Sequence, residues 1–182
     1  MNSSCCFKLI RLQLQNIKVE IGHIIFGEVR LSWDETKIKE EAIVNIFKSN
    51  GFPVIKDKDQ QLIEKIKIAV IELIHYSGYK SSIIRNSDYL VDKLAYSYQH
   101  LSTVFSNYEN ITLEKYIILN KIEKVKELLE NDELTLSEIA FQLEYSSVQY
   151  LSTQFKNITG ITVSEYKKEN YHLRIPLEKL SE

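Results

Sequence analysis

The chain has 182 residues, of which 44% are hydrophobic and 26% are charged, and its formal net charge is -2. These values are ordinary for a globular protein, and no apolar run approaches the roughly 18 residues that a membrane span needs, so a membrane protein is excluded. The opening MNSSCCFKLIRLQLQ has no basic segment followed by an uninterrupted apolar core. A secretory signal is therefore not expected, and the predicted location is cytoplasmic.

The cysteines indicate the same kind of compartment. Cys5 and Cys6 are the only two, and they are adjacent. Neighbouring cysteines with no partner elsewhere in the chain argue against a disulfide framework and fit a reducing environment.

The first half of the chain mixes alternating and helical patterns. Asp34 is the expected N-cap of one helix, and Gly51 is its expected stop. With a short extended segment before Phe7, the order of elements would complete a ferredoxin-like βαββαβ unit. The expected elements are a helix over 7–16, two strands within 18–33 broken near 23–27, a helix over 34–50, a strand over 51–57 and a helix over 60–74.

A Gly- and Ser-containing segment, HYSGYKSS at 75–82, separates this half from a uniformly helical one. The sequence therefore predicts an α+β protein with two domains, a ferredoxin-like domain over 1–76 and an all-α domain over 77–182. From Ser82 onward there are 11 Lys plus Arg and 15 Asp plus Glu, a balance of -4. This acidic balance is unusual for a nucleic-acid-binding region.

The helical half contains an internal repeat. Residues 97–117, SYQHLSTVFSNYENITLEKYI, match residues 147–167, SVQYLSTQFKNITGITVSEYK, at 10 of 21 positions with a constant shift of 50. Chance would give about one or two matches. Upstream the shift becomes 49, which pairs Leu90 with Ile139. Each copy is a short helix, a tight turn and a second helix, as in a helix-turn-helix.

Helical periodicity separates two faces of each second helix. In the second copy, Ser146 or Ser147 is the expected N-cap, and Leu151, Phe155 and Ile158 are expected to face the core. The corresponding inward set of the first copy is Leu101, Phe105 and Tyr108. The outward residues are short and polar, which suits contact with base edges, and they are Gln99, Thr103 and Ser106 in the first copy and Gln149, Thr153 and Lys156 in the second, with Ser152 on the flank.

A single helix is expected between the two copies, over 112–130. Its 19 residues would extend roughly 28 Å, close to the ~34 Å pitch that separates successive major-groove faces of a duplex. One chain is therefore expected to bridge two adjacent grooves.

The run LTLSEIAFQLEYSSVQYLSTQFKNITGITVSEYKK resembles the signature of the AraC/XylS family. This resemblance implies a bipartite DNA-binding domain in which two recognition helices enter successive major grooves. Carried over by position, it implies base contacts from Gln99, Ser102 and Thr103 and from Gln149, Ser152 and Thr153. Together with the outward faces, the expected DNA-binding residues are Gln99, His100, Ser102, Thr103, Ser106, Ser147, Gln149, Ser152, Thr153 and Lys156.

Three positions depart from the family pattern. Glu144 stands where a turn Gly is usual, Val163 replaces a usual Pro, and neither recognition helix contains Arg. Arg is the commonest partner of guanine, and Lys and Arg supply much of the affinity for phosphates. Weak or strongly salt-dependent binding is therefore expected.

The N-terminal half resembles the heavy-metal-associated ferredoxin-like domain through CCFKLI, IIFGEVRL and NGFPVIKD. In such domains soft thiolates hold ions such as Cu(I). Here Cys5 and Cys6 would be the metal ligands, but Lys8 stands where a second spaced thiolate would be needed. The alternatives are therefore a soft-metal site at Cys5 and Cys6, and a degenerate site or dimerisation module that binds no cofactor.

The sequence as a whole predicts a sequence-specific transcription regulator whose partner is double-stranded DNA. A homodimer formed through the N-terminal domain is a further expectation. Since the chain has no Gly-rich phosphate loop and no nucleophile elbow, an enzyme is not expected. The alternative function is a metal- or redox-responsive binding protein in which the helical domain is a platform for a partner.

Overall fold

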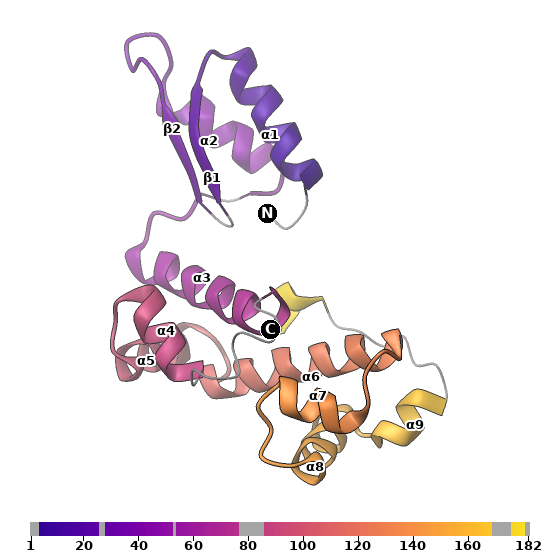
Figure 1. Cartoon of the computed structure of the whole chain (residues 1–182). Helices are drawn as coiled ribbons and strands as arrows, with labels where there is room; N and C mark the ends of the chain where they lie inside the picture. Colours follow the sequence, from indigo (N-terminus) through magenta and orange to yellow (C-terminus); the bar gives the residue numbers. More distant parts are fainter. Residues whose placement is uncertain (1–3, 26–27, 53, 77–85, 169–175, 181–182) are drawn as a thin grey trace. The chain divides into compact units, whose positions relative to one another are not determined.

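The structure is a computed structural model that describes residues 4–25, 28–52, 54–76, 86–168 and 176–180 (Figure 1). The chain divides into two compact units, Met1–Glu64 and Lys65–Glu182, and the division falls within helix α3 (Lys58–Ile71). The predicted boundary between 76 and 77 lies further along the chain. Within the predicted linker, His75 and Tyr76 end a π-helix, η1 (Glu72–Tyr76), whereas 77–82 lie outside the described residues.

The first unit contains a small antiparallel hairpin and two helices. Strands β1 (Glu20–Ile25) and β2 (Glu28–Ser32) pair with each other, and α1 (Ser4–Asn16) and α2 (Glu40–Ser49) pack together beside them (Figure 1). The buried centre of this unit consists of apolar side chains from both helices and from the segment that enters β1, and these are Ile10, Leu14, Val19 and Ile43.

The predicted ferredoxin-like βαββαβ unit is not confirmed. The described sheet has two strands only. Helix α1 already begins at Ser4, because the apolar positions of Ile10 and Leu14 follow a helical spacing that extends backward through the cysteines. The expected strand over 51–57 is absent at 51, 52 and 54–57, where the carbonyl of Ile55 accepts a side-chain hydrogen bond from Gln61 rather than one from a neighbouring strand.

The predicted N-cap at Asp34 is also wrong. Helix α2 begins at Glu40 after Lys39, and the Asp34 carboxylate instead accepts hydrogen bonds from the backbone and hydroxyl of Thr36 at 3.0 and 2.6 Å. Asp is as well suited to such a local turn as to a helix N-terminus, so its spacing alone does not separate the two. The stop at Gly51 is confirmed, because that residue has a φ of 78° just after the helix.

The described part of the second unit is helical. Apolar residues of α3 and η1 are buried, and the remaining helices follow in the order that the repeat predicts. Among the described helices none is long and apolar enough to cross a membrane. The remaining elements are α4 (Asn86–Leu94), α5 (Tyr98–Tyr108), α6 (Leu113–Asn131), α7 (Leu136–Gln142), α8 (Val148–Thr159), α9 (Val163–Lys168) and the short 3-10 helix η3 (Leu177–Lys179).

Candidate nucleic-acid interface

The two predicted helix-turn-helix copies are α4–α5 and α7–α8. Ser97 and Ser147 are the N-caps of α5 and α8, and their side chains accept hydrogen bonds from the third backbone amide of each helix at 3.3 and 3.1 Å. Between Ser146 and Ser147, the structure therefore selects Ser147. Leu101 and Leu151 are fully buried at equivalent positions and fix the buried face of each helix.

The turns of the two copies share an uncommon backbone conformation. Ala95 and Glu144 have φ values of 59° and 58°, in the left-handed region that favours glycine. The shift of 49 that pairs Leu90 with Ile139 also pairs Ala95 with Glu144. The two turns therefore match in backbone geometry although neither contains a glycine.

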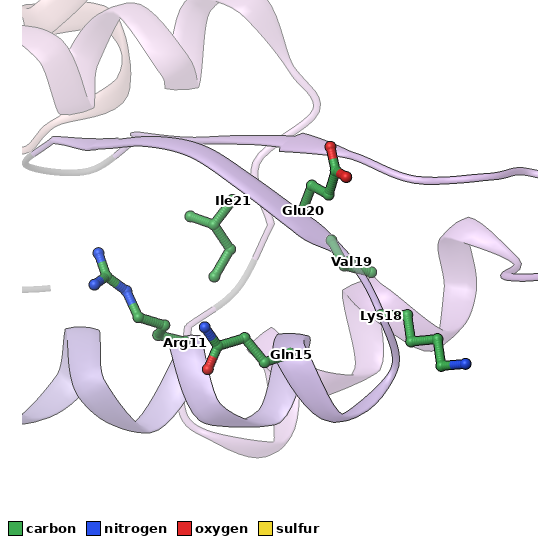
Figure 2. A pocket seen from close by; sticks show the side chains of 6 residues that line it. All are labelled: Arg11, Gln15, Lys18, Val19, Glu20 and Ile21. Carbon is green, nitrogen blue, oxygen red and sulfur yellow. The ribbon is translucent and has the colours of Figure 1, made fainter.

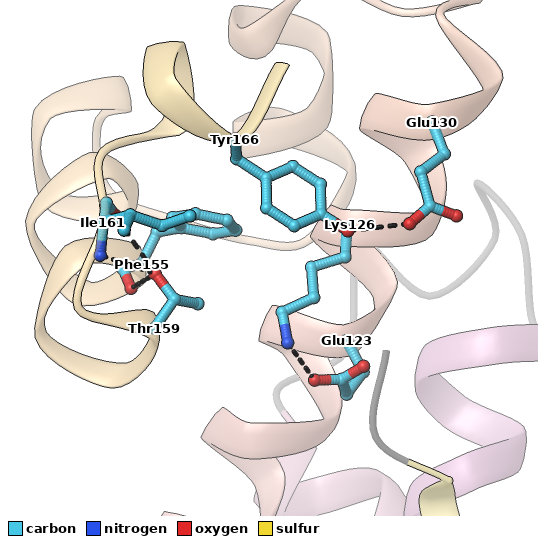
Figure 3. A network of polar contacts seen from close by, with 7 residues as sticks. All are labelled: Glu123, Lys126, Glu130, Phe155, Thr159, Ile161 and Tyr166. Atoms are coloured by element: carbon cyan, nitrogen blue, oxygen red, sulfur yellow. Dashed lines mark hydrogen bonds and ion pairs between the residues drawn. The ribbon is translucent and has the colours of Figure 1, made fainter. Parts of the chain in front are cut away.

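Each copy contains the same packed pair of a phenylalanine and a tyrosine. The rings of Phe105 and Tyr116 have centroids 5.2 Å apart, and those of Phe155 and Tyr166 are 5.5 Å apart. Aromatic rings at such distances pack favourably in edge-on or tilted arrangements. Figure 3 shows the second pair, together with the hydrogen bond that the Tyr166 hydroxyl donates to Glu130 at 2.7 Å. The duplication in sequence is therefore a duplication of core packing.

Helix α6 takes part in both copies. Its N-cap is Thr112, it runs for 19 residues as predicted, and it supplies Tyr116 to the first copy. Lys121 donates a hydrogen bond to the backbone carbonyl of Leu143 at 2.8 Å, at the end of α7. Near the end of α6, Glu130 binds Tyr166 of α9. The helix between the copies is thus part of the core of each.

Lys121 and Glu144 form a partly buried charged contact beside the second turn. The nearest Nζ and Oε2 atoms are 4.0 Å apart. Burial lowers the pKa of Lys121 and raises the pKa of Glu144, and in each case the opposite charge of the partner resists the shift. Glu144 of the second turn therefore lies beside α6.

The predicted DNA-binding residues lie on the solvent side of α5 and α8. Ser102 and Ser152 are half-buried, and the others are exposed. The exposed set is Gln99, His100, Thr103 and Ser106 from α5, and Ser147, Gln149, Thr153 and Lys156 from the start and outer face of α8. Both copies thus place a Gln and a Thr, one helical turn apart, in solvent.

Several of these polar groups also make contacts inside the protein. The hydroxyl of Thr153 donates to the backbone carbonyl of Gln149 at 2.9 Å, and Ser147 caps α8. The hydroxyl of Ser102 lies 3.5 Å from Glu114. Gln99 and Gln149 have long exposed amides, which leaves them as the side chains of this set best suited to pair with a base edge.

Exposed aromatic residues near the recognition helices were missed by sequence reasoning. Tyr96 is 47% exposed and stacks on His100 with ring centroids 5.1 Å apart, and Tyr150 is 54% exposed beside Tyr145. The repeat alignment contains a usable signal, because it pairs His100 with Tyr150 at the third position of each helix. Each copy therefore presents a ring at the start of its recognition helix.

The prediction that Tyr108 faces the core is wrong. Tyr108 is 50% exposed, whereas Val104 is buried beside Leu101 and Phe105. Tyr108 is the last residue of α5, so the helix ends before another turn can carry its ring over the core. The buried face is therefore completed within the preceding turn.

A pocket of about 700 Å³ lies between α1 and β1 in the first unit. Figure 2 shows that Arg11 and Gln15 of α1 and Ile21 of β1 point into the space between helix and strand. Of the residues that line the pocket, only Val19 is buried. The lining is mostly exposed and polar, and it assigns no ligand.

Cys5 and Cys6 lie on α1, and their side chains are outside the described part of the structure. Among the residues that are described, no group of three His, Cys, Asp or Glu side chains is arranged to hold a metal ion. The soft-metal site at Cys5 and Cys6 therefore stays a prediction.

Comparison with known proteins finds its matches in the helical half of the chain. A family model described as a helix-turn-helix domain matches residues 90–169. The chain is 28% identical over 118 residues to the Msm operon regulatory protein of Streptococcus mutans, covering 65% of this chain and 42% of that protein. It is 29% identical over 102 residues to the xylose operon regulatory protein of Escherichia coli, covering 56% and 26%. The chain thus spans less than half the length of these relatives.

A solved structure shows the same fold. The C-terminal domain of AraT, a response regulator from Geobacillus stearothermophilus, superposes with a TM-score of 0.50 at 22% identity, covering 66% of this chain and 92% of that one. At this identity the similarity concerns the fold alone. The family model thus identifies residues 90–169 of the chain, which include α5 to α9, as a helix-turn-helix domain.

Proposed function

We propose that this protein is a transcription regulator that binds specific sequences of double-stranded DNA through α5 and α8. The observation that carries the proposal is the duplication itself. Two copies with the same N-cap, turn conformation and aromatic pair present the same exposed Gln and Thr. Relatives named as operon regulators support the same class of function.

The proposed binding mode uses two successive major grooves. Helix α6 joins the copies with 19 residues, or roughly 28 Å of helix, which is near the ~34 Å pitch of the duplex. Gln99 and Gln149 would read base edges, and Thr103 and Thr153 would contact the neighbouring base or sugar. His100, Ser102, Ser106, Ser147, Ser152 and Lys156 would complete the contacts around them.

Charge limits the strength of this interaction. Helix α5 contains no Lys or Arg, and α8 contains one, Lys156. Since few phosphate contacts come from these helices, specific recognition must rest more on polar base contacts and on the shape of the DNA. We therefore propose a regulator of modest affinity whose binding falls as salt rises.

The decisive experiment is selection of bound fragments from the source's genomic DNA by the full chain at low salt, followed by affinity measurements on the selected duplex. The expected result is one enriched sequence with two contacted segments about one helical turn apart. A matched control replaces both Gln99 and Gln149 by Ala. Equal binding to every fragment, or no binding, would refute the proposal.

Homodimerisation through the first unit is part of the proposal. Leu9 and Leu12 of α1 are 45% and 60% exposed, and large exposed apolar side chains on one helix favour association with another surface. Sedimentation of the full chain against a Leu12→Asp variant tests this point. A monomer for both proteins would remove dimerisation and leave DNA binding as a separate question.

A further inference from the structure

The segment of α3 and η1 over 65–76 belongs to the body that carries the helix-turn-helix copies, although it precedes the matched domain of 90–169. Its apolar face is buried in the second unit. The buried side chains of this segment are Ile66, Ala69, Val70, Ile71, Leu73 and Ile74. A segment buried to this extent is a structural part of the unit and not a connector.

Side chains of this segment contact each of the next three helices. The Nζ atom of Lys67 lies 2.8 Å from a carboxylate oxygen of Glu109 at the end of α5. Glu72 pairs with Lys93 of α4. The Nδ1 atom of His75 lies 3.6 Å from a carboxylate oxygen of Glu127 of α6. The segment is therefore connected to every helix of the first copy.

The contact with α5 explains a residue that a helix would otherwise disfavour. Glu109 is the C-cap of α5, where the helix dipole disfavours negative charge. Its side chain is 16% exposed and that of Lys67 is 20% exposed, so the pair is shielded from solvent. The Lys67 ammonium supplies the positive charge that this helix end lacks.

The recognition helix of the second copy is closed by residues of its own end. Thr159 occupies the position equivalent to Glu109, and its hydroxyl donates to the carbonyl of Phe155 at 2.8 Å. Gly160 then closes α8 in the left-handed conformation, with a φ of 80°. Helix α8 is thus completed by local residues, whereas α5 is completed by a side chain 42 positions earlier (109 minus 67).

We infer that Lys67 is a positioning residue for the first recognition helix, and that it holds the end of α5 through Glu109. This inference rests on the proposed function for its effect on DNA, but its structural consequence is independent of DNA. Loss of the Lys67 charge should loosen α5 and leave α8 unchanged.

Hydrogen exchange of the full chain in the absence of DNA tests the structural consequence. In Lys67→Met, the amides of 98–108 should exchange about tenfold faster, whereas those of 148–159 should keep the wild-type rate. Lys65→Met is the matched control, because Lys65 is an exposed lysine on the same helix. Unchanged exchange in α5, or equal acceleration in α8, would overturn the inference.

A charge-exchanged double variant separates positioning from a general loss of stability. Lys67→Glu combined with Glu109→Lys restores opposite charges, and it should recover slow exchange in α5 relative to either single change. No recovery, in a double variant whose α8 exchanges at the wild-type rate, would also contradict the inference.

Footprinting on the selected duplex tests the consequence of the Lys67 contact for DNA binding. Lys67→Met should lose protection at the segment contacted by α5, with about tenfold weaker binding, and keep protection at the segment contacted by α8. Equal loss at both segments, or no loss, overturns the positioning role. Failure of the wild-type chain to select any duplex would refute the proposed function, and the exchange measurements would still decide the role of Lys67.

Discussion

Ala95 and Glu144 adopt the same left-handed backbone conformation, with φ values of 59° and 58°, at equivalent turns of the two helix-turn-helix copies. A side chain in this conformation costs about 1–2 kcal/mol relative to ordinary helical backbone. The turn geometry is therefore imposed by the packing of the helices on either side, and it persists without the glycine that would favour it.

This geometry predicts that glycine at position 144 is stabilising relative to alanine. Glu144→Gly and Glu144→Ala both lose the carboxylate beside Lys121, but only glycine relieves the left-handed strain. The free energy of unfolding, measured by urea denaturation, should be about 1 kcal/mol higher for the glycine variant than for the alanine variant. Equal stabilities would show that the turn relaxes when the side chain is shortened.

The same residue predicts a pH dependence. Burial raises the pKa of the Glu144 carboxyl, so the folded chain binds this proton more tightly than the unfolded chain does. The free energy of unfolding should therefore decrease as pH rises from the usual pKa of Glu to the raised one. Glu144→Gln should remove this decrease in a series of denaturation curves between about pH 4 and 7.

Glu165 provides a control of opposite sign. Hydrogen bonds from the Thr162 backbone and hydroxyl lower the pKa of Glu165, so its contribution to stability is lost as pH falls through the lowered value. Glu165→Gln should thus reduce stability at neutral pH and flatten the acid side of the profile. Parallel profiles for both variants and the wild type would contradict the two assignments.

The Tyr166 hydroxyl is predicted to stabilise the second copy. It donates to Glu130 at 2.7 Å while its ring packs on Phe155. Tyr166→Phe keeps the ring and removes the hydrogen bond, and it should lower the free energy of unfolding by about 1 kcal/mol in thermal or urea denaturation. Tyr150→Phe, at a ring that is 54% exposed, should change stability little. A smaller effect at 166 than at 150 would exclude this role.

Gln149 is predicted to contribute sequence specificity. Gln149→Ala should weaken binding to the selected duplex by about 1–3 kcal/mol, the range of one bidentate base contact, and leave binding to an unrelated duplex unchanged. Fluorescence anisotropy at fixed salt measures both affinities. Gln60→Ala, at an exposed glutamine of α3, is the control. Equal weakening of binding to both duplexes would show that Gln149 contacts the sugar-phosphate backbone of the DNA rather than a base.

Lys156 is predicted to contact a phosphate. It is exposed on α8 and is the one lysine or arginine of that helix. Lys156→Gln should weaken binding on all duplexes and reduce the slope of log affinity against log salt by about 0.9. The slope should not change in Lys65→Gln. An unchanged slope for Lys156→Gln would exclude the phosphate contact.

The helical half of the fold could be predicted from the sequence because its information is local. Ser97 and Ser147, the buried Leu101 and Leu151, and the helix after Thr112 all follow from caps and helical spacing within about 20 residues. The repeat then supported each assignment with a second copy. The prediction for Tyr108 was wrong because helical periodicity does not show at which residue a helix stops packing against the core.

The first unit could not be predicted to the same extent, because a sheet depends on partners distant in sequence. Alternation correctly located the two strands that became β1 and β2, but it could not show how many strands would pair. The contact of Lys67 with Glu109 could not be predicted either, because no spacing rule relates residues so far apart in the sequence. Exposure of Gln99 and Gln149 was predictable, but the contacts that occupy the hydroxyls of Ser102 and Thr153 were not.

Helix α6 has a mechanical consequence for the DNA. Since α6 packs Tyr116 against Phe105 of one copy and accepts the hydrogen bond of Tyr166 of the other through Glu130, a change in the distance between the copies would break these contacts. Its rise of roughly 28 Å is shorter than the ~34 Å between groove faces of a straight duplex. In the proposed complex, a spacing set by this helix would require the duplex to curve, and easily bent base steps between the two contacted segments would then favour binding without being touched.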